Sequence, residues 1–248
     1  MNKSHLSYRT SNPALNSNTF KASNNSFLLD DKMTIQGTVD KTAISLVLLV
    51  IAAYYTYSAG MESMIMLGSI GGLILALITI FKKEWAPFTV PLYAILEGLA
   101  LGSISYLFNL QYEGIVLQAI SITVLVLFSL LFAYRTKIIQ PTENFKLGLF
   151  AATGGIFLLY MVSFIMSFFG SGISLLSSNN SSMLSIGLSL GIVIIAALNL
   201  VIDFDFIEEG SEKGAPKYME WYAAFGLLVT LIWLYLELLR LLAKMKNR

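Results

Sequence analysis

The sequence predicts an all-α membrane protein, a bundle of seven transmembrane helices, on three observations. The chain of 248 residues is 56% hydrophobic and only 12% charged, with a mean hydropathy of +0.72, whereas soluble domains carry about 25% charged residues. The apolar residues gather in long blocks of roughly 17 to 25 residues, the length at which a helix crosses a hydrocarbon core of ~30 Å. The loops between the blocks alternate between lysine-bearing and lysine-free, as successive crossings require.

Each apolar block is expected to be a helix, because a helix satisfies every backbone polar group within its own segment. A transmembrane β-barrel would instead need short segments that alternate with a period of two. The expected spans are residues 42–58, 62–81, 87–108, 115–134, 147–169, 182–204 and 219–243. They belong to one domain, residues 33–248.

Residues 1–32 precede this domain and are rich in Asn and Ser. We expect a disordered cytoplasmic tail there. The tail lacks the apolar core of a signal peptide, so the first span serves as the insertion signal.

Positive charge marks one side of the membrane. The loops "AGME", "NLQYEG" and "GSGISLLSSNNSS" contain neither Lys nor Arg. The alternate loops carry Lys82, Lys83, Arg135, Lys137, Lys146, Lys213 and Lys217. The positive-inside rule therefore places the N-terminus in the cytoplasm.

The C-terminus departs from this pattern. Arg240, Lys244, Lys246 and Arg248 would favour a cytoplasmic location, whereas seven full crossings place the C-terminus outside. Two topologies stay open. The first, which we favour, has seven spans, and the second has six spans followed by a re-entrant last helix.

The inventory of residues excludes several function classes. The chain has no cysteine, and its single histidine, His5, lies in the polar tail, which excludes zinc–thiolate and histidine-based sites inside the membrane. A formal net charge of +1 excludes a strongly basic surface for nucleic acid. We expect a protein without enzymatic activity and without a cofactor.

Ionisable side chains inside a membrane are costly, so each is a functional candidate. The candidates are Glu97, Asp203, Asp205 and Glu237, with Asn199, Thr230 and Arg240 as supporting polar residues. Asp203 and Asp205 are about 200° apart on a helix, so one site cannot receive both. Asn199 shares the face of Asp203, which makes Asp203 the interior candidate, unless both aspartates only mark the water boundary.

The other two acids have alternative interpretations. Glu97 lies among small residues, so it either bonds a neighbouring helix or lines a cavity. Glu237 and Arg240 are three apart and can form a local ion pair. Burial disfavours a charged carboxyl, and carboxylates also suit Ca²⁺. A proton-sensitive cation gate is therefore plausible, with Ca²⁺ near Asp203, although no residue set gives a certain metal site.

Two stretches of sequence resemble the Bax inhibitor family, also called the transmembrane Bax inhibitor motif family. "PLYAILEGLALGSISYLF" is similar to its Pro-x₅-Glu-Gly-Leu-x-Leu-Gly stretch, and "LVIDFDFIEEG" to its aspartate-bearing segment, with Asp203 and Ile207 at the family's spacing. The similarity covers residues 33–245. The stretches at residues 33–49 and 214–242 resemble a bacterial branch, so we expect a bacterial plasma membrane protein.

The resemblance implies a bundle with the last helix at its centre. It also implies a pH-sensitive Ca²⁺ leak, gated by two aspartates on the last two spans. Asp203 matches the first aspartate, but Thr230 stands where the family has the second, and the nearest acid is Glu237. Either Asp205 or Glu237 substitutes for the missing aspartate, or the leak is absent.

Two functions therefore compete. The first is a cation leak channel with a carboxylate pH sensor. The second is a regulator without transport activity that binds other membrane proteins, such as proteases or secretion complexes. An intramembrane aspartyl protease is disfavoured, because Asp203 has no second aspartate on another span, and a proton-coupled transporter is disfavoured because broken spans are weak here. The oligomeric state stays open.

Overall fold

The computed structural model describes residues 32–170 and 172–248, and within these ranges seven helices are long and apolar enough to cross a membrane. The helices are α1 (Ile35–Ala59), α2 (Met64–Phe81), α3 (Ala86–Gln111), α4 (Ile115–Arg135), α5 (Glu143–Phe168), α6 (Met183–Glu212) and α7 (Met219–Lys246). The predicted fold class is confirmed. The expected disordered tail, apart from Lys32, lies outside the described residues.

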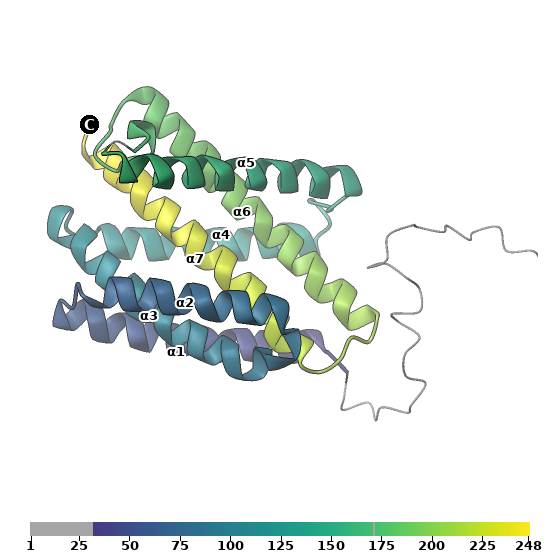
Figure 1. The fold of residues 1–248 in the computed structure, drawn as a ribbon. Coiled ribbons are helices and arrows are strands. Elements are labelled where there is room, and N and C mark those ends of the chain that lie inside the picture. The colour runs from purple at the N-terminus through teal and green to yellow at the C-terminus, as the bar shows by residue number, and fades with distance from the viewer. Residues whose placement is uncertain (1–31, 171) are drawn as a thin grey trace, which may run out of the picture.

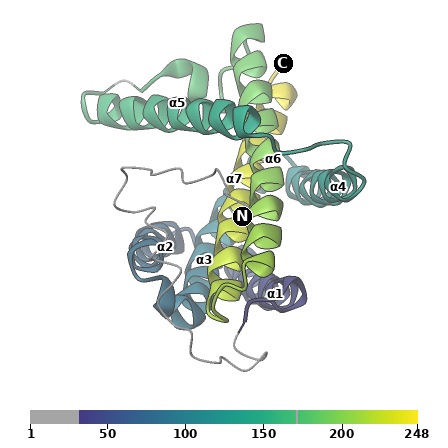
Figure 2. The same ribbon diagram turned by 90° about the vertical axis from the view of Figure 1, so that its right-hand side faces the viewer.

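Helix α7 lies at the centre of the bundle and runs obliquely through it (Figure 1). It packs against α1, α3, α4 and α6, and Leu228, Leu234 and Leu239 on α7 are completely buried. Helix α5 is the opposite case, because it packs mainly on α6 and extends away from the other helices (Figure 2). Most of its surface is therefore left to face lipid.

Small residues bring α3 very close to its neighbours α1 and α2. A Cβ atom on Gly98 would overlap the Leu49 carbonyl and lie 2.8 Å from the Ala52 Cβ, and one on Gly102 would overlap the Ala53 carbonyl. The Thr56 hydroxyl uses this proximity to donate to the Leu99 carbonyl at 3.0 Å. Without water in the bilayer, such close packing supplies much of the attraction between helices.

The loops sort to two ends of the bundle. The lysine-rich face holds residues 82–85, 136–142 and 213–218, together with the start of α1, where the Met33 amide donates to Ala215 at 2.7 Å. The lysine-poor face holds residues 60–63, 112–114 and the α5–α6 loop.

The C-terminus lies at the lysine-poor face. Lys246 donates to the Glu113 carbonyl at 2.9 Å, and Asn247 donates to the Ser178 carbonyl at 3.1 Å. Because α7 begins at the opposite face and is 28 residues long, it crosses completely. The structure therefore favours seven spans over the alternative of a re-entrant last helix.

Helix α6 continues beyond the expected end of its span. The prediction ended it near residue 204, whereas the helix runs to Glu212 and stops before Gly214, which has a φ of +63°. The prediction ended the span where the hydropathy falls, at Asp203. The glutamate-rich sequence that follows still favours a helix. The two aspartates therefore lie within a continuous helix.

The sorting of the loops predicts which residues are accessible together. The chain lacks cysteine, so single cysteines can be introduced without background. We expect a membrane-impermeant maleimide to label Asn179→Cys and Arg248→Cys from one side of intact vesicles, and Gln140→Cys only from the other. Labelling of Arg248→Cys together with Gln140→Cys would contradict the full crossing of α7.

The close contact of α3 with α1 predicts a difference between two glycines. Gly98→Ala forces a methyl group into the backbone of α1, and overpacking of this kind costs about 1–3 kcal/mol. Gly154→Ala on α5 is the control, since nothing lies within 4 Å of its Cβ position. We expect a lower midpoint of thermal unfolding in detergent for Gly98→Ala alone, and equal midpoints would refute the packing.

Candidate functional site

Asp203 lies at the contact of α6 with the central helix α7. A Cβ on Gly226 would be 3.7 Å from Asp203 Oδ1, and Thr230 is beside the carboxyl. The Thr230 hydroxyl donates to the Gly226 carbonyl at 3.2 Å. The Asp203 Oδ2 atom is buried and has no hydrogen-bond partner, and none of the ion pairs among residues 32–170 and 172–248 includes Asp203. Asp203 is thus a half-buried acid with one buried oxygen that has neither a hydrogen-bond partner nor a counter-charge.

Asp205 points to another part of the bundle. Its carboxylate lies 2.7 Å from the Lys146 ammonium of α5, which is also 3.5 Å from Glu143. One turn further, Glu208 accepts a hydrogen bond from the Tyr134 hydroxyl of α4. These contacts fasten the end of α6 to α4 and α5 near the lysine-rich face. Asp205 is therefore an acid with a partner, unlike Asp203.

Asn199 is not brought to the Asp203 carboxyl, although the two residues are four apart on α6. Its amide donates to the Thr153 hydroxyl of α5 at 2.9 Å and to the Ile195 carbonyl at 2.8 Å. Asn199 therefore binds α5 to α6.

Glu237 is almost completely buried on α7 and forms a three-residue network. Its Oε1 accepts hydrogen bonds from the Tyr160 hydroxyl of α5 and from Arg240, both at 2.6 Å. Arg240 also donates to the Tyr160 oxygen. The other carboxylate oxygen of Glu237 has no partner. The spacing of Glu237 and Arg240 suggested their pairing, but sequence reasoning missed Tyr160, because no pattern links α5 to α7.

Glu97 lies at a third helix contact, between α3 and α2. The Glu97 carboxylate fills the space that a Cβ on Gly72 of α2 would need. Glu97, Asp203 and Glu237 therefore lie in separate contacts. Among the residues that the structure describes, no group of three or more His, Cys, Asp or Glu could hold a metal ion. The described acids do not assemble a multidentate Ca²⁺ site.

Sequence reasoning also missed Glu220, which begins α7 and is completely buried. It accepts hydrogen bonds from the Thr34 amide at 3.0 Å and the Thr34 hydroxyl at 2.9 Å. Lys217 and Lys41 lie 3.2 Å and 3.5 Å from its carboxylate. Gly37 leaves the room that this carboxylate occupies. The cluster fixes the start of α1 to the start of α7, and its only local signal in the sequence was Lys217, three residues before Glu220.

Lys244 is a second buried charge that the sequence did not reveal. Its ammonium donates to the Leu175 carbonyl at 2.7 Å and the Ser189 hydroxyl at 2.8 Å, and a third oxygen, of Ser185, is 3.4 Å away. The α5–α6 loop and the start of α6 thus supply the oxygens that surround this cation. This explains how a basic C-terminus lies at the lysine-poor face.

Comparison with known protein families identifies the family of this chain. The pattern of the family described as Bax inhibitor 1 like matches residues 12–247. The chain belongs to the Bax inhibitor 1-like family. Comparisons with curated proteins and with solved structures find no match.

This Bax inhibitor 1-like chain has one acid, not two, at the contact of its last two helices. The resemblance in sequence implied a second aspartate on α7, and the residue beside Asp203 is Thr230. A hydroxyl cannot share a proton with Asp203 as a second carboxyl can. Any titration at this contact therefore belongs to Asp203 alone.

The Glu237 network predicts that Tyr160 stabilises the fold. Tyr160→Phe removes a donor to a buried carboxylate, and loss of such a hydrogen bond costs about 1–3 kcal/mol. We expect a lower midpoint of thermal unfolding in detergent for Tyr160→Phe. Tyr55→Phe is the control, because Tyr55 is exposed on α1. A similar small change in both variants would show that the network contributes little.

Proposed function

We propose that this protein is a pH-sensitive cation leak channel, with Ca²⁺ as the transported ion, in a bacterial plasma membrane and with its N-terminus in the cytoplasm. The observation that supports this proposal is the buried Oδ2 atom of Asp203, which has no hydrogen-bond partner at the contact of α6 with the central helix. The proposal involves no catalytic step and no bound cofactor.

The charge of Asp203 is the variable in this mechanism. A neutral acid can donate a hydrogen bond to the Thr230 oxygen and keep α6 against α7. A carboxylate at the same place lacks a counter-charge, and an unpaired buried charge is strongly unfavourable. It therefore favours an arrangement that admits water or a hard cation to its oxygens. Protonation thus shifts the population between two packings of α6 and α7.

The other acids have supporting parts in this proposal. Asp205 and Glu237 are the two acids that could substitute for the absent second aspartate. However, Asp205 pairs with Lys146, and Glu237 binds Arg240 and Tyr160. Their partners neutralise them, so in this proposal they position α6 and α7. Glu97 lies at a different helix contact and is the remaining candidate for lining a pathway.

A second function remains in competition, that of a regulator that binds other membrane proteins, such as proteases or secretion complexes. The exposed surface of α5 favours this function. Helix α5 lies at the periphery (Figure 2), and its large apolar side chains include Phe150, Phe157, Phe164 and Phe168, all exposed. Such a row of side chains can receive a transmembrane helix of a partner as well as lipid.

The first measurement for the channel function is Ca²⁺ flux into proteoliposomes at about pH 6, 7 and 8, a range over which a buried carboxyl can titrate. We expect wild-type flux to change with pH and Asp203→Asn to lose this dependence. Asp205→Asn is the matched control two residues away and should keep the dependence, as should Glu237→Gln. Thr230→Asp adds the second carboxyl, and its flux should change over a wider pH range.

Either result of this measurement discriminates between the two functions. Flux equal to that of empty liposomes at every pH would exclude the channel and leave the regulator. Flux that keeps its full pH dependence in Asp203→Asn would retain the channel but remove Asp203 as the sensor.

A further inference from the structure

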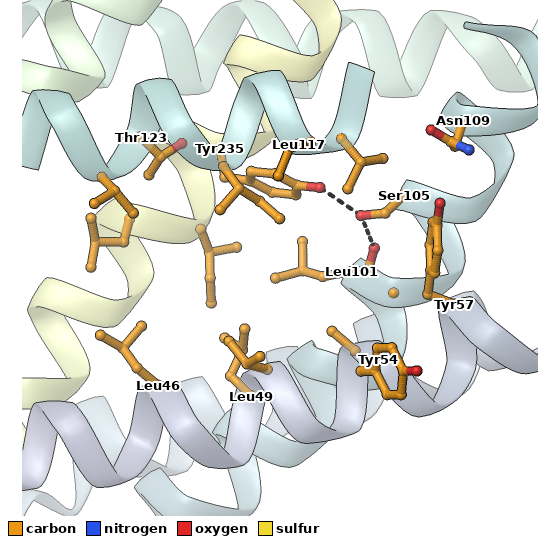
Figure 3. Close-up of a pocket in the computed structure, with 18 of the residues that line it drawn as sticks. Leu46, Leu49, Tyr54, Tyr57, Leu101, Ser105, Asn109, Leu117, Thr123 and Tyr235 are labelled. Carbon is orange, nitrogen blue, oxygen red and sulfur yellow. Dashed lines mark hydrogen bonds between the residues drawn. The ribbon is translucent and has the colours of Figure 1, made fainter. Parts of the chain in front are cut away.

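An apolar groove of about 650 Å³ lies between α1, α3, α4 and α7 (Figure 3). Its volume is within the range of ligand pockets, about 300–1,000 Å³. None of the acids discussed as candidate sensors lines it. The groove is thus separate from the contact of Asp203 with α7.

The groove opens sideways, toward the lipid. Its floor is formed by α3 and α7, where Leu101, Leu228 and Ile232 are buried. Its lips are the exposed side chains Val50 on α1 and Leu117 on α4. Since both lips belong to membrane-spanning helices, the medium at the opening is the hydrocarbon of the bilayer.

The hydroxyl groups of Ser105, Thr123 and Tyr235 in the wall of the groove are already satisfied by the protein itself, whereas Tyr54 and Tyr57 of α1 also line the groove. Ser105 donates to the Leu101 carbonyl at 2.6 Å, so the Tyr235 hydroxyl, 2.7 Å from Ser105, is the donor of that second bond (Figure 3). Thr123 donates to the Ala119 carbonyl at 2.8 Å. A bound water needs about two to four polar partners, and these hydroxyls have no donor left to offer. The occupant that matches this wall is a hydrocarbon.

One end of the groove is polar. Asn109 and Glu113 line it there, next to Gly114 and the start of α4, at the lysine-poor face. The groove extends from this end to Leu46 and Leu127, deeper in the bundle. An amphiphile could therefore place its polar group at the membrane surface and its chain inside.

We propose that the groove binds one acyl chain of a membrane lipid, which enters between α1 and α4 from the leaflet at the lysine-poor face. The competing occupant is a helix of a second copy, which the test below distinguishes from an acyl chain. The inference is independent of the channel function, since it rests on the groove alone.

The test uses the full chain in phosphatidylcholine vesicles that contain phosphatidylcholine with a diazirine on one acyl chain. After illumination, mass spectrometry locates the labelled residues. We expect label at Leu228 and Ile232 of the floor, several-fold above that at Leu239, an equally buried residue of α7 outside the groove. Labelling of the lips alone, or equal labelling of floor and Leu239, would overturn the proposal.

Two neighbouring substitutions supply the matched control. Val50→Trp fills the groove from its lip and should reduce floor labelling several-fold. Ile51→Trp changes the next residue, equally exposed but outside the groove, and should leave the labelling unchanged. Leu117→Trp closes the opposite lip and repeats the test from α4. Floor labelling that persists in Val50→Trp and Leu117→Trp would refute the proposal.

A cysteine variant in the same labelled vesicles tests a second copy as the occupant. Leu117→Cys introduces the chain's only cysteine, so oxidation can link two copies only through this position. Disulfide-linked dimers together with an unlabelled floor would assign the groove to a second copy and overturn the proposal. Monomers with a labelled floor support the acyl chain.

Discussion

The bilayer offers no hydrogen-bond partners, and the arrangement of this bundle follows from how α7 satisfies its polar side chains. Four of them contact four different parts of the bundle. Glu220 binds the start of α1, Thr230 lies beside Asp203 of α6, Glu237 binds Tyr160 of α5, and Lys244 binds the α5–α6 loop. An unsatisfied polar group in hydrocarbon costs several kcal/mol. These contacts therefore fix the position of each neighbour along the axis of α7. The leucines between them require only that α7 be buried by other helices.

The two sides of α1 show two ways of packing in the membrane. Toward α3, glycines let the backbones touch, and the Thr56 hydroxyl crosses to the Leu99 carbonyl. Toward α4 there is no such close contact, and the groove lies between the two helices, with Val50 of α1 on its lip. Interior cavities are costly in a soluble core, but a cavity that opens to lipid can be filled by lipid. The groove is thus compatible with a close-packed bundle.

Much of the fold could be predicted from the sequence, because each span is a long, mostly apolar block and each loop carries or lacks lysine. One error came where an acid lowers the hydropathy without ending its helix, and another where a charge is satisfied by distant partners. The end of α6 was placed too early because Asp203 lowered the hydropathy of a helix that continues to Glu212. The C-terminus was ambiguous because Lys244 is held by Leu175 and Ser189, partners more than fifty residues away. Helical spacing did separate Asp203 from Asp205, but it could not reveal Tyr160.

The segment 226–235 of α7 connects the two proposed sites. On one side, Gly226 and Thr230 lie against Asp203. On the other side, Leu228 and Tyr235 line the groove. A shift of this segment away from α6, in response to charge on Asp203, would narrow or reshape the groove. By reciprocity, an acyl chain that resists this movement favours the neutral state of Asp203. The bilayer would then influence the pH response of the protein through the same helix that holds the bundle together.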